Sequence, residues 1–277
     1  MSGRRQRLVR MLFLHDTSSH KLENSVTIHF SIERTCGSLD TRVNRMPTFQ
    51  ICGERMRFQI AIDGPAGAGK STIARRVSET LGFIYVDTGA MYRAMGLYFL
   101  ARGIDTDDES AINASLPGAD ISLQILDGSQ HVFLNGEDVS VRVRTEEAGM
   151  MASKTSRYSK NREKMVAMQQ EIARTSNVVM DGRDIGTVVL PNAPLKIYLT
   201  ASVSVRAQRR YQELLRKGQH PVLQEIEKDI EARDYQDMHR EASPLRQAAD
   251  AILIDSSSLT IDEVAARIVE LAQDRMA

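Results

Sequence analysis

Residues 58–81 read FQIAIDGPAGAGKSTIARRVSETL, and this stretch decides the fold. It begins with alternating apolar side chains that end at Asp63, which predicts a short buried strand. The glycine-rich segment GPAGAGKS follows. Apolar residues then recur every four positions at Ile73, Val77 and Leu81, which predicts an amphipathic helix. The pattern G-x-x-x-x-G-K-S between a strand and a helix is typical of a phosphate-binding P-loop.

The chemistry of a triphosphate explains these residue types. Small residues let backbone N–H groups surround a phosphate, and the N-terminus of the helix adds partial positive charge. We expect Lys70 to reach the β- and γ-phosphates and the Ser71 hydroxyl to ligate Mg²⁺. The predicted ATP-binding residues are Gly64, Pro65, Ala66, Gly67, Ala68, Gly69, Lys70, Ser71 and Thr72.

Composition narrows the class of protein. The 277 residues carry 36 Lys and Arg against 36 Asp and Glu, so the chain has no net field that would attract a nucleic acid. Both cysteines, Cys36 and Cys52, lie in the first segment of the chain, which fits a reducing compartment. No apolar run approaches the roughly 20 residues of a membrane span. We expect a soluble, cytoplasmic protein without nucleic-acid or membrane partners.

Residues 1–57 show no sustained hydrophobic period and hold ten basic against five acidic side chains. Three interpretations remain open: a disordered basic extension, translated sequence upstream of a start at Met46 or Met56, and an organelle-targeting peptide. In each case we place the catalytic domain at residues 58–277. Deletion of residues 1–55 is expected to leave activity intact.

The rest of the chain alternates predicted strands with predicted helices. Strands are expected at residues 83–86, 178–180, 195–199 and 251–254, and helices at 90–101, 160–174, 203–217, 223–238 and after the capping box of Thr260 and Glu263. This succession predicts an α/β fold with a parallel-sheet P-loop core. Ligands are expected at the carboxyl ends of its strands.

Residues 119–143 have a different character. Apolar and polar residues alternate in three runs, separated by Asp127-Gly128 and Asn135-Gly136, which are dipeptides typical of hairpin turns. The third run holds Val139, Val141 and Val143. We therefore expect an insert of about residues 104–165 that contains antiparallel strands. An edge meander of the main sheet is the alternative.

The class of P-loop protein follows by elimination. The sequence has no Asn-Lys-x-Asp motif of a GTPase switch, and it is short for a motor or transporter ATPase. Small-molecule kinases need a mobile basic lid that neutralises the transferring phosphoryl group. Arg206, Arg209 and Arg210 are spaced to share one helix face. We predict that they act with Lys70 in catalysis, on a helical lid of about residues 203–222; a solvated surface helix is the alternative.

Two carboxylates follow predicted strands near the P-loop. Asp63 and Asp181 could each orient Mg²⁺ through water, and each could instead cap the next turn. The sequence leaves the choice between them open.

Three segments of the chain resemble bacterial-type cytidylate kinase, a P-loop nucleoside monophosphate kinase. They read IDGPAGAGKSTIARRVSETLGFIYVDTGAMYRA, VVMDGRDIGTVVLPNAPLKIYL and ARDYQDMHREASPLRQAADAILIDS. The similarity covers essentially all of residues 58–277 and includes the acceptor-binding insert. It implies transfer of the γ-phosphoryl group from ATP to CMP and dCMP, with Mg²⁺ as cofactor, by a monomeric enzyme.

The resemblance also implies an acceptor site. Asp184 would accept a hydrogen bond from the exocyclic amine of cytosine, where uracil presents a carbonyl. The implied CMP-binding residues are Thr88, Tyr92 and Arg93 at the monophosphate pocket, Ser153, Arg162 and Asp184 at the base, Arg233 and Asp237 at the ribose, and Arg183 and Arg240 at the phosphate. Thr88 stands where relatives often carry Ser, and it keeps the hydroxyl.

Two alternative functions remain to be tested. One is another small-molecule kinase, acting on UMP or shikimate, and turnover of UMP equal to that of CMP would contradict base reading by Asp184. The other is a nucleotide-dependent binding protein without turnover. It would bind ATP but release no ADP in the presence of CMP.

Overall fold

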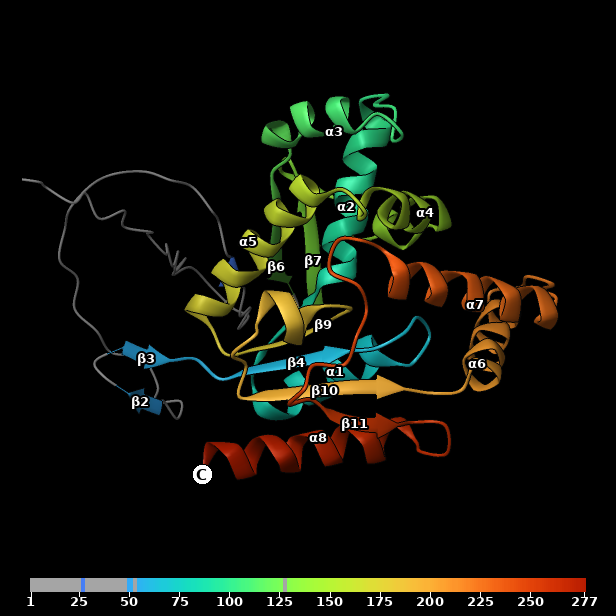
Figure 1. Ribbon diagram of the computed structural model, residues 1–277. Helices are drawn as coiled ribbons and strands as arrows, with labels where there is room; N and C mark the ends of the chain where they lie inside the picture. Colours follow the sequence, from blue (N-terminus) through green and yellow to red (C-terminus); the bar gives the residue numbers. More distant parts are fainter. Residues whose placement is uncertain (1–25, 28–48, 52–53, 127–128) are drawn as a thin grey trace, which may run out of the picture. The chain divides into compact units, whose positions relative to one another are not determined.

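The computed structural model describes residues 26–27, 49–51, 54–126 and 129–277 (Figure 1). The chain divides into two compact units, one that includes Arg93–Met151 and one that includes Thr48–Tyr92 and Ala152–Ala277. The first unit begins and ends earlier in the chain than the insert predicted at about residues 104–165. The interpretations offered for the N-terminal extension fall mostly outside the described residues.

A five-stranded parallel sheet forms the centre of the larger unit, in the order β11-β10-β4-β9-β5 (Figure 1). Its strands are β4 (Gln59–Asp63), β5 (Ile84–Asp87), β9 (Val178–Gly182), β10 (Leu195–Thr200) and β11 (Ile252–Asp255). The register pairs Asp63 with Gly182 and Asp87 with Asp181, so the carboxyl ends of these strands meet at one edge. The predicted parallel α/β fold is confirmed.

Helices alternate with these strands along the chain. They are α1 (Lys70–Leu81), α2 (Thr88–Ala101), α4 (Glu146–Thr155), α5 (Ser159–Thr175), α6 (Val203–Arg216), α7 (Leu223–His239) and α8 (Ile261–Met276). Apolar side chains of α1 and α8, such as Val77 and Ile268, pack with Ile60 and Ile197 of the sheet in one buried core. The predicted capping box of Thr260 and Glu263 is present at the start of α8.

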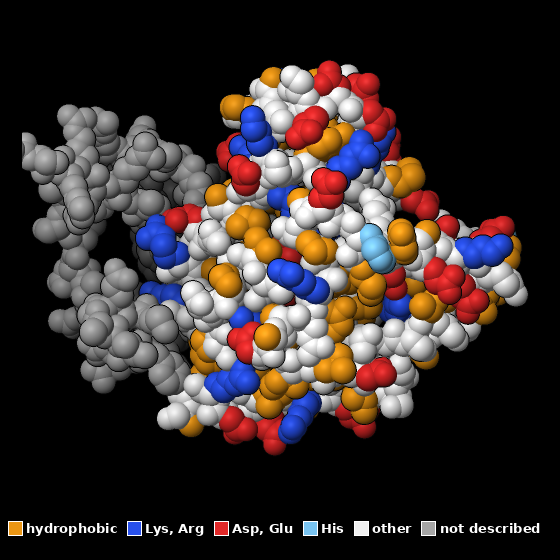
Figure 2. All heavy atoms as spheres, viewed as in Figure 1, with side chains coloured by type: hydrophobic (Ala, Val, Ile, Leu, Met, Phe, Trp, Pro, Cys, Tyr) orange, Lys and Arg blue, Asp and Glu red, His pale blue; other side chains and the backbone are white. Residues whose placement is uncertain are grey.

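Helices α6 and α7 pack on each other through a small separate core of Ala207, Ile226 and Ile230. Acidic side chains gather on the outer part of this pair (Figure 2). Glu225 and Asp229 of α7 are exposed. None of the helices within the described ranges is long and apolar enough to cross a membrane.

The smaller unit contains an antiparallel sheet in the order β1-β6-β7-β8. Its strands are β1 (Val26–Thr27), β6 (Ile121–Leu126), β7 (Ser129–Leu134) and β8 (Glu137–Asp138), and its helices include α3 (Glu109–Ser115). Asn135 and Gly136 have φ angles of 50° and 84°, as the predicted hairpin turn requires. The turn predicted at Asp127-Gly128 lies outside the described residues. Separately, β2 (Phe49–Ile51) pairs with β3 (Glu54–Met56).

The third alternating run of the smaller unit was wrongly predicted to be a strand. Strand β8 ends at Asp138, and Val141 is 84% exposed. Val139 and Val143 are buried, and the Val143 N–H donates to the Val139 carbonyl over 2.9 Å. Residues four apart share a face of a helical turn as well as of a strand, so the valine pattern did not separate the two.

Candidate active site

The turn between β4 and α1 requires glycine. Gly64, Gly67 and Gly69 have φ angles of 149°, 77° and 90°, a region that other residues rarely adopt. A Cβ atom on Gly64 would lie 1.9 Å from the carbonyl oxygen of Leu199 in the neighbouring strand. The chain can therefore make this tight turn only with glycine at these positions.

The N-terminus of α1 offers backbone N–H groups for an anion. No described side chain forms a capping hydrogen bond at its N-cap residue, Gly69. The first N–H groups of such a helix lack intrahelical partners, and a phosphate can accept from them. Lys70 is buried, and its ammonium donates to the Pro65 carbonyl over 2.7 Å. Burial lowers the pKa of Lys70, and a bound phosphate would favour its charged form.

Asp181, at the end of β9, faces the hydroxyl predicted to bind Mg²⁺. The Ser71 hydroxyl donates to Asp181 Oδ2 over 2.7 Å, and the Tyr85 hydroxyl donates to Oδ1 over 2.9 Å. Burial, followed by the charge of Asp87, raises the pKa of Asp181 to about 6. Asp181 is therefore ionised at neutral pH and adjacent to Ser71.

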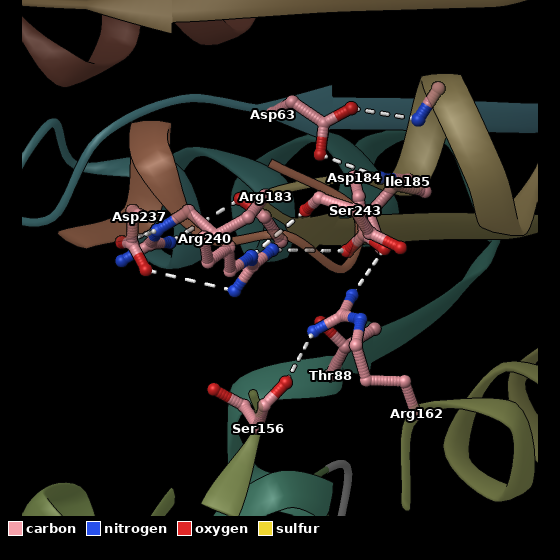
Figure 3. Close-up of polar contacts among 12 residues, drawn as sticks. Asp63, Thr88, Ser156, Arg162, Arg183, Asp184, Ile185, Asp237, Arg240 and Ser243 are labelled. Carbon is pink, nitrogen blue, oxygen red and sulfur yellow. Dashed lines mark hydrogen bonds and ion pairs between the residues drawn. The ribbon is translucent and has the colours of Figure 1, made fainter. Parts of the chain in front are cut away.

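Asp63 has a different role in this structure. Its two carboxylate oxygens accept hydrogen bonds from the backbone N–H groups of Ile185 and Gly186, over 2.8 and 2.7 Å (Figure 3). These residues open a single π-helical turn, Ile185–Val189. Burial raises the pKa of Asp63 to about 6 as well. The geometry therefore favours Asp181 for the metal and gives Asp63 the capping role.

The residues at Ser71 and Asp181 fit a magnesium ion. A hydroxyl and a carboxylate are hard oxygen ligands, and Mg²⁺ commonly takes few protein ligands besides waters and substrate phosphates. Within the described ranges no three His, Cys, Asp or Glu residues form a metal-binding group. Such a cluster is not needed for a metal that arrives with ATP.

A row of five charged side chains lies beyond β9, drawn in Figure 3. The Arg162 guanidinium pairs with Asp184, and Arg240 lies 4.0 Å from the other oxygen of Asp184. Arg240 also lies 3.7 Å from Asp237, which pairs with Arg183 over 2.7 Å. Three arginines thus alternate with two carboxylates. We call these residues the charged row; its net charge is +1.

The charged row and the neighbouring Tyr92 contain donors that form no hydrogen bond within the described part of this structure. Tyr92 OH, Arg162 Nε and Arg240 Nη2 are buried and have no hydrogen-bond partner among the described residues. The Arg162 guanidinium lies 5.5 Å from the centre of the Tyr92 ring. Buried donors without partners are costly, so a ligand that accepts hydrogen bonds would bind here favourably. A phosphate or a pyrimidine carbonyl has this chemistry.

Burial and the neighbouring charges shift the pKa values of residues in the row in different directions. Burial would raise the pKa of Asp237, but the charge and hydrogen bond of Arg183, together with the charges of Arg240 and Arg233, lower it. Burial likewise opposes the charge of Arg162, yet Tyr92 and Asp184 raise its pKa above the ordinary value. Burial and the charge of Arg162 lower the pKa of Arg240, as expected for a guanidinium that an incoming anion would stabilise.

Other residues predicted for the acceptor site have different surroundings. The Ser153 hydroxyl donates to Gln236 on α7 over 3.4 Å, so it is not placed as a direct partner of Asp184. The Thr88 hydroxyl donates to the Asp181 carbonyl over 2.6 Å. Arg233 is exposed on α7. Arg93 belongs to the smaller unit, and its predicted contact with phosphate stays a prediction.

The three arginines predicted for the lid also differ. Arg206 is buried and donates to the P-loop carbonyl of Ala66, whereas Arg209 donates to Ser256. Arg210 is partly exposed and pairs with Glu213. The alternative of a solvated surface helix therefore does not hold for Arg206. Contact of any of the three with the transferring phosphoryl group stays a prediction.

Sequence reasoning missed several residues of this region. Asp234, on α7, pairs with Arg206 over 2.7 Å. Ser256 is buried after β11 and connects Arg209 to the Ala68 carbonyl of the P-loop. The spacing of α7 carried a partial signal, because Asp234 lies three residues before Asp237 and both lie on one helix face.

A glycine cradle with a buried lysine, a Ser–Asp pair for a metal and a second site of arginines define a P-loop phosphotransferase. The cytidylate kinase family model matches residues 60–274. A cytidylate kinase of Lactobacillus gasseri is 51% identical over 223 residues, which cover 80% of this chain and 97% of that protein. One of Caldicellulosiruptor bescii is 51% identical over 215 residues, 78% of this chain and 95% of that protein. The chain belongs to the cytidylate kinase family.

Proposed function

We propose that the enzyme transfers the γ-phosphoryl group of ATP to CMP and dCMP, yielding CDP or dCDP and ADP. The observation that carries the residue assignment is the charged row, in which a buried carboxylate, Asp184, lies between the guanidinium groups of Arg162 and Arg240. Family membership supports CMP as the acceptor. It does not favour a UMP kinase, a shikimate kinase or a binding protein without turnover.

The donor would bind at the P-loop, residues 64–72. Backbone N–H groups of the turn and of the first residues of α1 would surround the β-phosphate, and Lys70 would reach the β- and γ-phosphates. Ser71 would ligate Mg²⁺, with Asp181 orienting the metal through water. The metal would neutralise charge that develops on the transferring oxygens.

The acceptor base would be read by Asp184. Its carboxylate can accept from the exocyclic amine of cytosine, whereas uracil has a carbonyl oxygen there and would be repelled. The ion pair with Arg162 orients Asp184, and Ser153 would complete the base site after a local rearrangement.

The acceptor phosphate would bind Arg183 and Arg240, together with Tyr92 and Arg93. A phosphate accepts bidentate hydrogen bonds from guanidinium groups and would satisfy the unused donors of Tyr92 and Arg240. The ribose would lie near Arg233 and Asp237, and Thr88 would border the monophosphate.

Phosphoryl transfer in this site depends on positioning and charge. The loose transition state spreads negative charge over the equatorial oxygens, which cationic groups stabilise. Arg209 and Arg210 of α6 would approach the transferring group when the lid closes. Arg206 would contribute through its contact with the P-loop. No general base is assigned, because this chemistry relies mainly on alignment.

A coupled assay of ADP release tests the function. We expect turnover with CMP and dCMP, and far lower turnover with UMP and AMP, in the full chain and after deletion of residues 1–55. Equal turnover of UMP and CMP would contradict base reading by Asp184. Light scattering of the same preparations tests the proposed monomer.

A further inference from the structure

Arg206 of α6 is bound on three sides. Its Nε donates to the Ala201 carbonyl over 2.9 Å, and its Nη1 donates to the Ala66 carbonyl over 2.9 Å. Its Nη2 pairs with Asp234 Oδ2 over 2.7 Å. Arg206 and Asp234 are both buried, so each charge depends on the other for compensation.

The contact with Ala66 bears on phosphate binding. In a trans peptide the carbonyl of one residue and the N–H of the next point in opposite directions. A fixed Ala66 carbonyl therefore fixes the direction of the Gly67 N–H, which belongs to the phosphate cradle. The backbone also lies close to Arg206, because a Cβ on Gly67 would be 3.3 Å from Arg206 Cβ. Arg206 thus supports the P-loop from the side opposite the Gly67 N–H.

Helix α7 connects this support to the second anion site. Asp234 contacts Arg206, and Asp237, three residues later, contacts Arg183 and Arg240 of the charged row. Residues three apart lie on the same helix face and move together with the helix. A shift of α7 would therefore change the contacts both at Ala66 and in the charged row.

We propose that Asp234 is a positioning residue that couples the ATP site to the CMP site through Arg206 and α7. The proposal rests on the proposed function. CMP bound at Arg183 and Arg240 fixes the Asp237 end of α7, Asp234 then holds Arg206, and Arg206 holds the Ala66–Gly67 peptide. Because coupling between two binding sites is reciprocal, each substrate tightens the binding of the other.

Calorimetry on the full chain tests the coupling. The dissociation constant of a non-hydrolysable ATP analogue with Mg²⁺ is measured with and without saturating CMP. In the wild type we expect CMP to tighten binding of the analogue by about fivefold or more. Asp234→Asn should abolish this effect and, because the coupling is reciprocal, remove the matching effect of the analogue on CMP binding, while binding of CMP alone changes less than about twofold.

The matched control is Asp229→Asn, which removes an exposed carboxylate from the same helix and should behave like the wild type. Arg206→Met tests the route, because Asp234→Asn should add no further loss in that background. If Asp234→Asn does not fold, Asp234→Glu, which keeps the charge at a shifted position, should lose part of the coupling.

Two results would overturn the proposal: preserved coupling in the folded Asp234 variant, or a loss of CMP affinity that is as large without the ATP analogue as with it. A wild type that does not turn over CMP would instead refute the proposed function, so the two failures can be told apart.

Discussion

The two anion sites of the larger unit are built from different parts of the chain. The donor site consists mostly of backbone: a glycine turn, the N-terminus of α1 and one lysine, all within residues 63–72. The acceptor site consists of side chains. The charged row draws on α5, the segment after β9, and the end of α7, which lie far apart in the sequence.

This difference has a physical reason. Triphosphates are bound alike in many proteins, largely by backbone N–H groups with one lysine, so the turn is a local motif. A nucleoside monophosphate must be told from its relatives, which requires specific donors and acceptors on side chains. Selectivity is therefore expected to reside in the charged row, and the capacity for phosphoryl transfer in the P-loop.

The largest effect is expected from Lys70→Met, which keeps the length of the side chain but removes its charge. The turnover number should fall by about a thousandfold, because the β- and γ-phosphates lose a fixed cation in the transition state. The coupled ADP assay measures this change. The dissociation constant of CMP, measured by calorimetry, should stay within about twofold of the wild type because Lys70 serves the donor site. A large loss of CMP affinity would contradict the assignment of separate donor and acceptor sites.

The next effect is expected from Asp184→Asn. An amide presents a donor as well as an acceptor to the base, and Arg162 loses its buried counter-charge. We expect kcat/KM for CMP to fall by about a hundredfold and the CMP-to-UMP ratio to collapse. The measurement is kcat/KM for both substrates, with the exposed Glu270→Gln of α8 as the control. A ratio that stays at the wild-type value would show that the row does not read the base.

A smaller effect separates the two carboxylates near the P-loop. Asp181→Asn should raise the Mg²⁺ concentration for half-maximal activity by about tenfold, because a neutral amide orients the metal less well. Asp63→Asn should leave the Mg²⁺ dependence unchanged and weaken CMP binding, because it loosens the turn at Ile185 and Gly186. The reverse outcome would exchange the roles of Asp63 and Asp181.

The smallest effect concerns pH. The pKa of Asp181 is raised to about 6 by burial and Asp87, so lowering the pH through 6 protonates the carboxylate and weakens binding of ATP with Mg²⁺. Calorimetry should show binding about fourfold weaker at about pH 5.5 than at about pH 7.5, and Asp181→Asn should remove this dependence.

Stability responds in the opposite sense. Because the folded pKa values of Asp63 and Asp181 exceed the ordinary 3.8, their contribution to folding is complete below that value and is lost as the pH rises through about 6. Thermal unfolding without nucleotide checks the sign of this effect on stability. For the binding prediction, a wild type whose affinity for nucleotide is higher at the lower pH would contradict the role given to Asp181.

The difference between a donor site made from one local segment and an acceptor site made from distant segments also explains which features the sequence could predict. The sequence predicted the P-loop with its flanking strand and helix, and the capping box at Thr260, because each depends on residues a few positions apart. The partners of Asp184 come from residues 22 and 56 positions away, and only the resemblance to a family indicated them. The choice between Asp63 and Asp181 needed coordinates, because two strand ends with the same residue type differ only in which neighbours they meet.

Burial was the other property that spacing could not give. Arg206, Arg209 and Arg210 share a helical pattern. Arg206 is nevertheless buried against the P-loop, whereas Arg210 is partly exposed. The rotation of α6 against its neighbours decides this, and Asp234, the buried partner of Arg206, is contributed by another helix.

Binding of CMP and cytidine to the wild type and to Arg240→Met most directly tests the claim that the charged row is the acceptor site. Titration calorimetry without ATP isolates the phosphate contribution, because the two ligands differ only by that group. We predict that the wild type binds CMP at least about tenfold more tightly than cytidine and that Arg240→Met removes most of this difference. An unchanged preference for CMP in the folded variant would contradict the account.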